Sequence, residues 1–291
     1  RTHPRAMLAT ATHDHKRGED ARARLAVLSE MPERWRDTAL RWILALPAGD
    51  APTLADRYLL VQTLVGAWPA DWDASRAAQP DGSVARWFGR LSQWQLKALR
   101  EAKLHTRWTD PDPAYEAAAD GQLGFLRSDP AGRALLGEIA AFAAEIAPAG
   151  MVNSLAQTLL RNTLPGIPDL YQGTELWDFS LVDPDNRHPV DYARREGLLD
   201  QARRAGTVDP SEAAWRSGAV KQALIQRLLA ASSRLPALFA QGECNPLPAH
   251  GRRAAHVLAW LRRHEEQSAL IVAPHCCARE LAGYARGRAG E

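Results

Sequence analysis

The hydrophobic pattern begins with a short, nearly uncharged segment, residues 6–12 (AMLATAT), which ends abruptly in the polar run His13–Arg17. A run of small and β-favouring residues of this length predicts a buried strand that carries polar groups at its carboxyl end. From Glu19 apolar residues recur at helical spacing until Pro32 interrupts the pattern. This order of strand, charged loop and helix is typical of one unit of an α/β barrel.

The next hundred residues, 33–147, predict helices almost throughout. Thr53 and Asp56 stand at capping-box spacing before a helix that ends near Trp68. Apolar residues recur at threes and fours over 84–102 and again over 135–146. A strand–loop–helix unit followed by so many helical residues predicts a helical insertion carried on a barrel loop.

Strand character returns in residues 162–175, where prolines and a glycine exclude a helix interior around Ile167. A second polar loop follows, then helical patterns over 192–204 and 213–232, and an antiparallel hairpin over 257–261 and 269–272. The predicted fold class is α/β: the seventh and eighth units of a (β/α)8 barrel, an all-helical insertion and the start of an antiparallel β domain. The expected domains are 1–32 (strand 7 and its helix), 33–150 (insertion), 151–240 (strand 8, its loop and helices) and 241–291 (incomplete β domain).

Composition narrows the function classes. Thirty-six Lys plus Arg against 34 Asp plus Glu leave a net charge of +2, which gives no electrostatic reason to expect nucleic acid or a membrane as partner. Three cysteines form no disulfide framework and suit a reducing cytoplasm. The longest uncharged run, residues 146–160, is too short and polar to span a bilayer. No signal peptide is expected, and the start at Arg1 suggests a fragment.

The polar run after the first strand is the first candidate site. An α/β barrel places its chemistry at the carboxyl ends of its strands, which makes Asp14 a candidate catalytic carboxylate, although Asp is also common in loops and at helix caps. His13 and His15 could instead form a metal pair, but no third ligand stands at useful spacing. Glu19 and Asp20 are interpreted as first-turn acids of the following helix. No phosphate-binding or dinucleotide fingerprint is present.

Tryptophan supplies 10 of the 20 aromatic residues. Core packing is the expected role of most of those within the helical stretch. Trp108 and Trp177 lie in polar loop sequences, which makes them candidates for walls of a sugar-binding subsite.

Three stretches resemble one family. ATATHDHKRGEDARARLAVLSEMPERW, KALREAKLHTRWTDPDPAYE and NTLPGIPDLYQGTELWDFSLVDPDNRHPVDY resemble the maltooligosyltrehalose synthases, members of the α-amylase superfamily of (β/α)8-barrel glycosidases. The stretches stand in the expected order and, with the helices between them, cover most of the chain. In that superfamily the His-Asp pair ends the seventh strand, and the GIPDLYQGTE stretch resembles the eighth.

The resemblance implies an activity and an incomplete site. The family rearranges the reducing-end α-1,4 linkage of a maltooligosaccharide to an α,α-1,1 linkage by intramolecular transglucosylation, without cofactor or metal. The nucleophile Asp and the acid/base Glu are expected upstream, in an N-terminal barrel half missing from this chain. The chain then corresponds to the C-terminal part of such an enzyme and is expected to be inactive alone.

The resemblance also implies roles for individual residues. Asp14 is expected to act as the third catalytic carboxylate with His13 beside it, and Lys16 and Arg17 to bind sugar hydroxyls, although salt bridges to Glu19 or Asp20 are an equal alternative. The remaining expected substrate contacts are Lys103, His105 and Trp108 in a lid, with Trp177, Asp185, Asn186 and Arg187 around the eighth loop. Rival hypotheses are another hydrolase or transglycosidase of the superfamily, and a noncatalytic helical or sugar-binding module.

Overall fold

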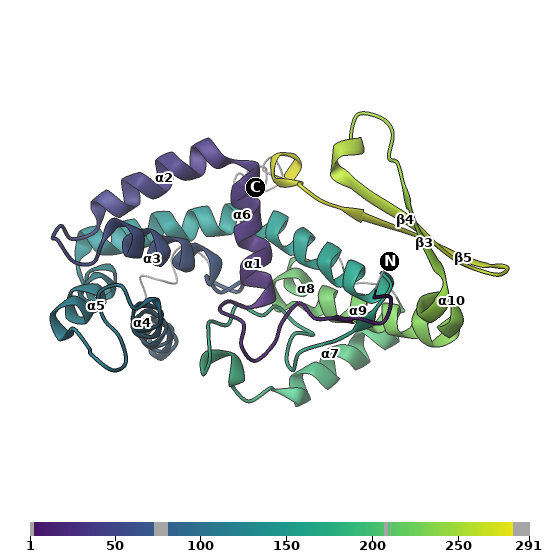
Figure 1. Ribbon diagram of the computed structural model, residues 1–291, viewed down its shortest axis with the longest axis horizontal. Coiled ribbons are helices and arrows are strands. Elements are labelled where there is room, and N and C mark those ends of the chain that lie inside the picture. The colour runs from purple at the N-terminus through teal and green to yellow at the C-terminus, as the bar shows by residue number, and fades with distance from the viewer. Residues whose placement is uncertain (1–2, 73–80, 207–208, 210, 282–291) are drawn as a thin grey trace.

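The computed structural model describes residues 3–72, 81–206, 209 and 211–281. Helices of the insertion region lie at one end of the molecule, and the later helices and a small sheet lie at the other (Figure 1). The elements are β1 Met7–Leu8, α1 Glu19–Ala26, η1 Val27–Glu30, α2 Pro32–Ala45, α3 Leu54–Gly66, α4 Gly82–Ala102, α5 Pro113–Ser128, α6 Pro130–Thr163, β2 Ile167–Pro168, η3 Asp185–Arg187, α7 Tyr192–Ala205, α8 Glu212–Ser217, α9 Ala219–Arg234, α10 Pro236–Gln241, β3 Glu243–Leu247, η4 Ala254–His256, β4 Val257–His264 and β5 Gln267–Pro274.

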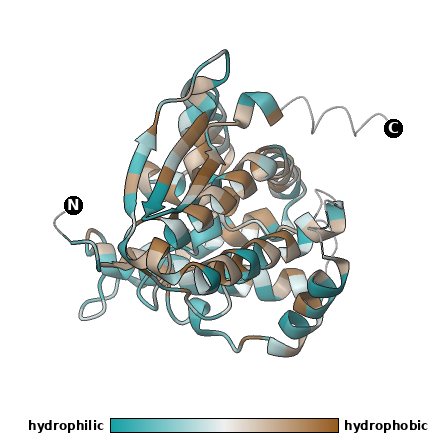
Figure 2. Ribbon diagram, turned by 90° about the vertical axis from the view of Figure 1, so that its right-hand side faces the viewer, coloured by the Kyte–Doolittle hydropathy of each residue, from teal (hydrophilic) through white to brown (hydrophobic). Residues whose placement is uncertain are grey.

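The helix α6 connects the two ends. It has 34 residues, and at the usual rise per residue it is about 50 Å long. Its first half packs in the large core with α2, α3 and α4, and its second half packs beneath the sheet through Ala156. The helix continues through Pro148, so the domain boundary expected at residue 150 falls inside a continuous element. Figure 2 shows apolar residues on the helices and strands in the middle of the molecule, with hydrophilic residues on the outer turns.

By length and composition α6 could cross a membrane, but half of its most apolar window is buried inside the protein. It contacts α1, α3, α5, α9 and β5. These contacts account for the apolar composition of α6 as that of a core helix.

Several sequence predictions of helices are confirmed. The helix α3 begins after Thr53, whose hydroxyl accepts a hydrogen bond from the Asp56 backbone N–H at 3.3 Å. The reciprocal half of the capping box is absent here, because the Thr53 backbone N–H donates to the Tyr115 hydroxyl at 3.0 Å. The spacing over 84–102 corresponds to α4, whose buried face includes Trp87.

The expected strands at residues 6–12 and near Ile167 are shorter and more exposed than predicted. Only Met7–Leu8 and Ile167–Pro168 form strands, and they pair in parallel. Met7 is 69% exposed and Ile167 54%, because no described element covers these side chains or extends the pair. A parallel pair exposed in this way differs from the usual parallel sheet, which is covered on both faces.

The predicted C-terminal hairpin is confirmed and has a third strand. β3, β4 and β5 are antiparallel in the order β3-β4-β5. Trp260, Ile271 and Ala273 pack against α6. The fully buried Arg262 joins the sheet to the helices, since its guanidinium donates to the Thr163 carbonyl at 2.7 Å and to carbonyls at the end of α10.

Most of the tryptophans have the expected structural role. Those buried in the large core are Trp35, Trp42, Trp68, Trp87 and Trp94, and Trp72 packs against it. Trp108 differs, because 55% of it is exposed. It therefore remains available for contact with another molecule.

Candidate active site

Two loops lie side by side beyond the carboxyl ends of β1 and β2. The Asp14 loop (residues 9–18) and the Asn186 loop (residues 169–190) are joined where the Gly18 N–H donates to the Ser180 carbonyl at 2.7 Å. Arg17 and Leu181 form a bridge beside this bond. A Cβ at position 18 would lie 2.4 Å from the Asp178 carbonyl oxygen, so only glycine permits this approach.

Asp14 and His13 stand at the tip of their loop. Their side chains are 81% and 64% exposed, and the His13 Nε2 lies 3.3 Å from the Asp14 Oδ2. The Asp14 backbone N–H donates to the Thr12 hydroxyl at 3.2 Å. The carboxylate is thus presented to solvent on a loop whose backbone is fixed by other groups.

Asn186 fixes the Asp14 loop from the opposite side. Its side-chain amide donates to the His13 carbonyl at 2.8 Å and to the Thr12 carbonyl at 3.3 Å. The Tyr171 hydroxyl donates in turn to the Asn186 carbonyl at 3.3 Å. The Asn186 Oδ1 is buried and has no hydrogen-bond partner among the described residues. The structure therefore brings Asn186, His13 and Asp14 together, as predicted for one site.

Asp185 is a brace beneath this site. It accepts a two-pronged interaction from Arg90 at 2.6 and 2.8 Å, and a hydrogen bond from the Leu181 N–H at 2.7 Å. Burial alone would raise the pKa of the Asp185 carboxyl, but Arg90 outweighs it and holds that pKa below its ordinary value. Arg187 pairs with Asp183 at 2.6 Å and is half-exposed.

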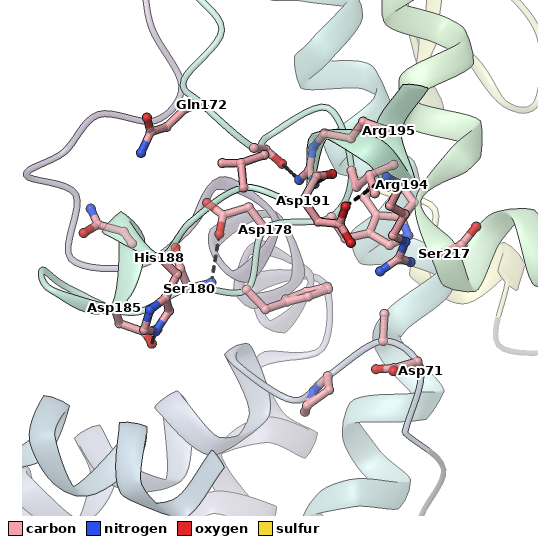
Figure 3. Close-up of a pocket in the computed structure, with 18 of the residues that line it drawn as sticks. Asp71, Gln172, Asp178, Ser180, Asp185, His188, Asp191, Arg194, Arg195 and Ser217 are labelled. Carbon is pink, nitrogen blue, oxygen red and sulfur yellow. Dashed lines mark hydrogen bonds and ion pairs between the residues drawn. The ribbon is translucent and has the colours of Figure 1, made fainter. Parts of the chain in front are cut away.

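A cavity of about 650 Å³ opens beside the Asn186 loop (Figure 3). Asp178 and Asp191 offer carboxylates to it, and Arg194 and Arg195 offer guanidinium groups. This mixture of acceptors and donors suits a ligand rich in hydroxyl groups. From the predicted set the wall includes Trp177, Asp185 and Asn186, whereas His13 and Asp14 lie outside it.

Trp177 lies in a loop, but its side chain is fixed by two contacts. Its indole N–H donates to the Trp215 carbonyl, and the Lys221 Nζ lies 5.7 Å from its ring centroid. The ring is therefore oriented by structural contacts where it lines the cavity.

The second stretch that resembles the family, residues 97–116, contacts the Asp14 loop through Glu101. The Lys16 Nζ lies 2.9 Å from the Glu101 carboxylate, close to the end of α4. Lys103 follows in a left-handed conformation, and His105 stacks on Tyr115 with ring centroids 4.5 Å apart. Trp108 has the Arg100 guanidinium 4.8 Å from its ring centroid. No described contact joins Lys103, His105 or Trp108 directly to Asp14.

The alternative that Arg17 and Lys16 pair with Glu19 or Asp20 is wrong. The Arg17 guanidinium donates to the Thr63 hydroxyl at 2.7 Å and lies 6.0 Å from the Trp94 ring centroid. Burial lowers the pKa of Arg17. Its side chain points toward the helical insertion because the acids of α1 are turned into the protein.

Glu19 and Asp20 form a buried cluster that the sequence did not predict. Both are first-turn acids of α1, as expected, but they are 1% and 3% exposed. The Lys221 Nζ lies 2.6 Å from Glu19 and 2.8 Å from Asp20, and Arg161 lies 3.2 Å from Glu19. The Thr10 hydroxyl donates to Glu19 at 2.5 Å. The cluster thus anchors the start of the Asp14 loop to α1, α6 and α9.

The metal-pair alternative for His13 and His15 is not supported by their directions. His13 is exposed beside Asp14, whereas the His15 ring is buried against Ser180 at 3.2 Å. Among the described residues no group of three or more potential metal ligands gathers.

Comparisons with known proteins find relatives of one kind. No family model matches the chain. Two proteins from strains of Mycobacterium tuberculosis, named as maltooligosyl trehalose synthases, are 38% identical over 263 residues, which is 89% of this chain and 30% of theirs. A maltooligosyltrehalose synthase structure from Arthrobacter ramosus matches 97% of the chain with a TM-score of 0.77 and 35% identity. A Sulfolobus tokodaii structure described as a hypothetical maltooligosyl trehalose synthase matches 91% with a TM-score of 0.71 and 27% identity. The chain covers 33% of each of these structures.

Proposed function

Because the chain is homologous to about a third of the maltooligosyltrehalose synthases, we propose that it is the C-terminal part of such an enzyme. The substrate is then a maltooligosaccharide, and the reaction converts its reducing-end α-1,4 linkage to an α,α-1,1 linkage. The observation that carries the proposal is the joined pair of loops, in which Asn186 holds the carbonyls of Thr12 and His13 beside a polar cavity.

The proposed mechanism is the retaining scheme of glycoside chemistry. A carboxylate attacks the anomeric carbon while a carboxylic acid protonates the leaving oxygen, and both groups belong to the N-terminal barrel half of the full-length protein. Asp14 accepts hydrogen bonds from hydroxyls of the sugar before the cleaved bond. These bonds strengthen as positive charge develops on the ring. The released glucose then turns and attacks through its own anomeric hydroxyl.

Two parts of the structure are assigned to the two sugars of this reaction. β1 and β2 correspond in the proposal to barrel strands seven and eight, since they are parallel, adjacent and followed by the two site loops. The helices α4 and α5 carry Lys103, His105 and Trp108 as a lid over the released glucose. The exposed Trp108 ring, oriented by Arg100, is the side chain best suited to stack on that sugar.

Product analysis of the full-length protein tests this function against its rivals. After incubation with maltopentaose we expect a product of the same mass that lacks a reducing end, because the linkage is moved and no water is added. A hydrolase of the same superfamily would instead release shorter reducing sugars. A noncatalytic sugar-binding module would leave maltopentaose unchanged. Either result would contradict the proposal.

Replacement of Trp108 by alanine tests the lid. We expect the ratio of free glucose to trehalose-type product to rise several-fold, because a lid that retains the cleaved sugar competes with water for the covalent intermediate. Cleavage itself should slow less. The matched control is Leu44→Ala, which removes another exposed apolar side chain, 68% exposed on α2. A collapse of total turnover with an unchanged product ratio would give Trp108 a positioning or structural role instead.

A further inference from the structure

The buried imidazole of His15 has two partners on opposite sides. Its Nδ1 lies 3.2 Å from the backbone nitrogen of Thr12, and its Nε2 lies 3.2 Å from the Ser180 hydroxyl oxygen. Only 6% of the side chain is exposed. One ring therefore spans the gap between the two site loops directly behind His13 and Asp14.

These partners determine the protonation state that fits. A backbone N–H can only donate, so the Nδ1 facing Thr12 must carry a lone pair. The ring proton then resides on Nε2, from which it donates to the Ser180 hydroxyl. A doubly protonated imidazolium would place two N–H groups against each other at Thr12 and break that link.

The surroundings favour the neutral ring. Burial lowers the pKa of His15 and Arg22 acts in the same direction, whereas Asp178, with a carboxylate oxygen 3.8 Å from Nε2, the Thr12 backbone and Glu19 oppose it without outweighing it. Tyr171 packs on the ring edge-on, with centroids 5.9 Å apart. The net result is a histidine that is neutral at pH 7.

Other contacts hold the two ends of the Asp14 loop, at Thr10, Arg17 and Gly18. The side chains of His13 and Asp14 contact each other, and their loop is anchored to the Asn186 loop from one side by Asn186. His15 supplies the anchor at the Thr12 N–H, which Asn186 does not reach. The two anchors act on neighbouring peptide units and together define the direction of Asp14.

We propose that His15 is a positioning residue for the carboxylate of Asp14, and that it acts only as the neutral Nε2–H form that ties Thr12 to Ser180. Acidification then frees the Asp14 loop without any change at Asp14 itself. This inference rests on the proposed role of Asp14 at the sugar. It makes His15 a second source of acid sensitivity, separate from the carboxylates of the missing barrel half.

The test compares His15→Phe and His15→Asn in the full-length protein. Phenylalanine fills the volume but offers neither an acceptor to Thr12 nor a donor to Ser180, so we expect kcat to fall about tenfold at pH 7, the scale of the two hydrogen bonds that are lost. Asparagine places an acceptor oxygen near the position of Nδ1 and does not titrate. It should recover most of the lost turnover, and between pH 7 and pH 5 it should lose less activity than the wild type.

A measurement independent of turnover accompanies these profiles. Hydrogen–deuterium exchange of a peptide covering residues 9–18 should quicken in His15→Phe and return toward the wild-type rate in His15→Asn, while His264→Phe on β4 changes neither exchange nor kcat. Wild-type exchange in the Phe variant, or superimposable pH profiles for wild type and Asn variant, would overturn the proposal. Failure of the protein to form a trehalose linkage would refute the proposed function, and the exchange data would still decide whether His15 anchors the loop.

Discussion

Replacement of Asp14 by asparagine is expected to lower kcat of the full-length enzyme by about a hundredfold or more. In the proposed mechanism the carboxylate acts where positive charge develops in the transition state, and removal of one such electrostatic group typically costs at least this much. Folding should be nearly unaffected, because the side chain is 81% exposed and its described charge partner is the neighbouring His13.

Steady-state kinetics with maltopentaose, together with circular dichroism, measure both parts of this expectation. Asp37→Asn is the matched control, since Asp37 is also an exposed carboxylate, 68% exposed and paired with its neighbour Arg36. The control should keep wild-type kcat. Near-normal turnover of Asp14→Asn would remove Asp14 from the proposed mechanism, whatever the product.

The largest expected effect on stability comes from Lys221→Met. This change leaves Glu19 and Asp20 buried with one cation fewer, and removing one partner of a buried ion pair typically costs about 3–5 kcal/mol. The midpoint of urea denaturation should fall accordingly. Lys16→Met, which breaks an exposed pair with Glu101, should cost about 1 kcal/mol or less. Equal midpoints for the two variants would contradict the assigned role of the buried cluster.

The same cluster predicts how stability depends on pH. Burial alone would lower the pKa of Lys221, but Asp20 and Glu19 outweigh it and raise that pKa above 10.5. A raised lysine pKa stabilises the folded state fully below the unfolded value, and this stabilisation is lost as pH rises through the folded pKa. The wild type should therefore lose more stability than Lys221→Met above pH 10.5, where denaturation midpoints can be compared directly.

The loss of stability at acid pH is a less decisive measurement, because the pKa shifts of two carboxylates act on stability in opposite directions. Burial would raise the pKa of Glu19, but Lys221 and Arg161 hold it below 4.5, so its stabilisation is complete above that value and disappears as pH falls through the lowered pKa. Burial raises the pKa of Asp20, which has the reverse effect. Among these groups, Lys221 alone determines the loss of stability at basic pH, so the measurement at basic pH is the sharper one.

Local patterns in the sequence predicted the helices well because the forces that specify them act within a few residues. The apolar residues of α4 recur every three or four positions, and the Thr53 cap bonds to a residue three positions later. The family resemblance, carried by quoted motifs, is confirmed by relatives at 38% identity. The helix patterns and the family motifs are each carried by residues that are close together in the sequence.

The rest of the site depends on partners far apart in the chain. Asp185 was expected to contact the substrate, and its carboxylate is held by Arg90, which lies 95 residues earlier. Asp20 meets Lys221 across 201 residues, so no local pattern shows that this acid is buried. The length of a strand is equally non-local, since β1 and β2 extend only as far as each finds a neighbour.

The continuity of α6 has a mechanical consequence. A hinge needs residues whose φ and ψ angles can change, and from Pro130 to Thr163 the backbone stays helical, although Pro148 removes one hydrogen bond of the helix. The core around Trp42 and the core beneath the sheet thus both pack against α6. Under the proposed function, opening and closing over a bound sugar is therefore expected in segments outside α6, such as the connection between α4 and α5, residues 103–112.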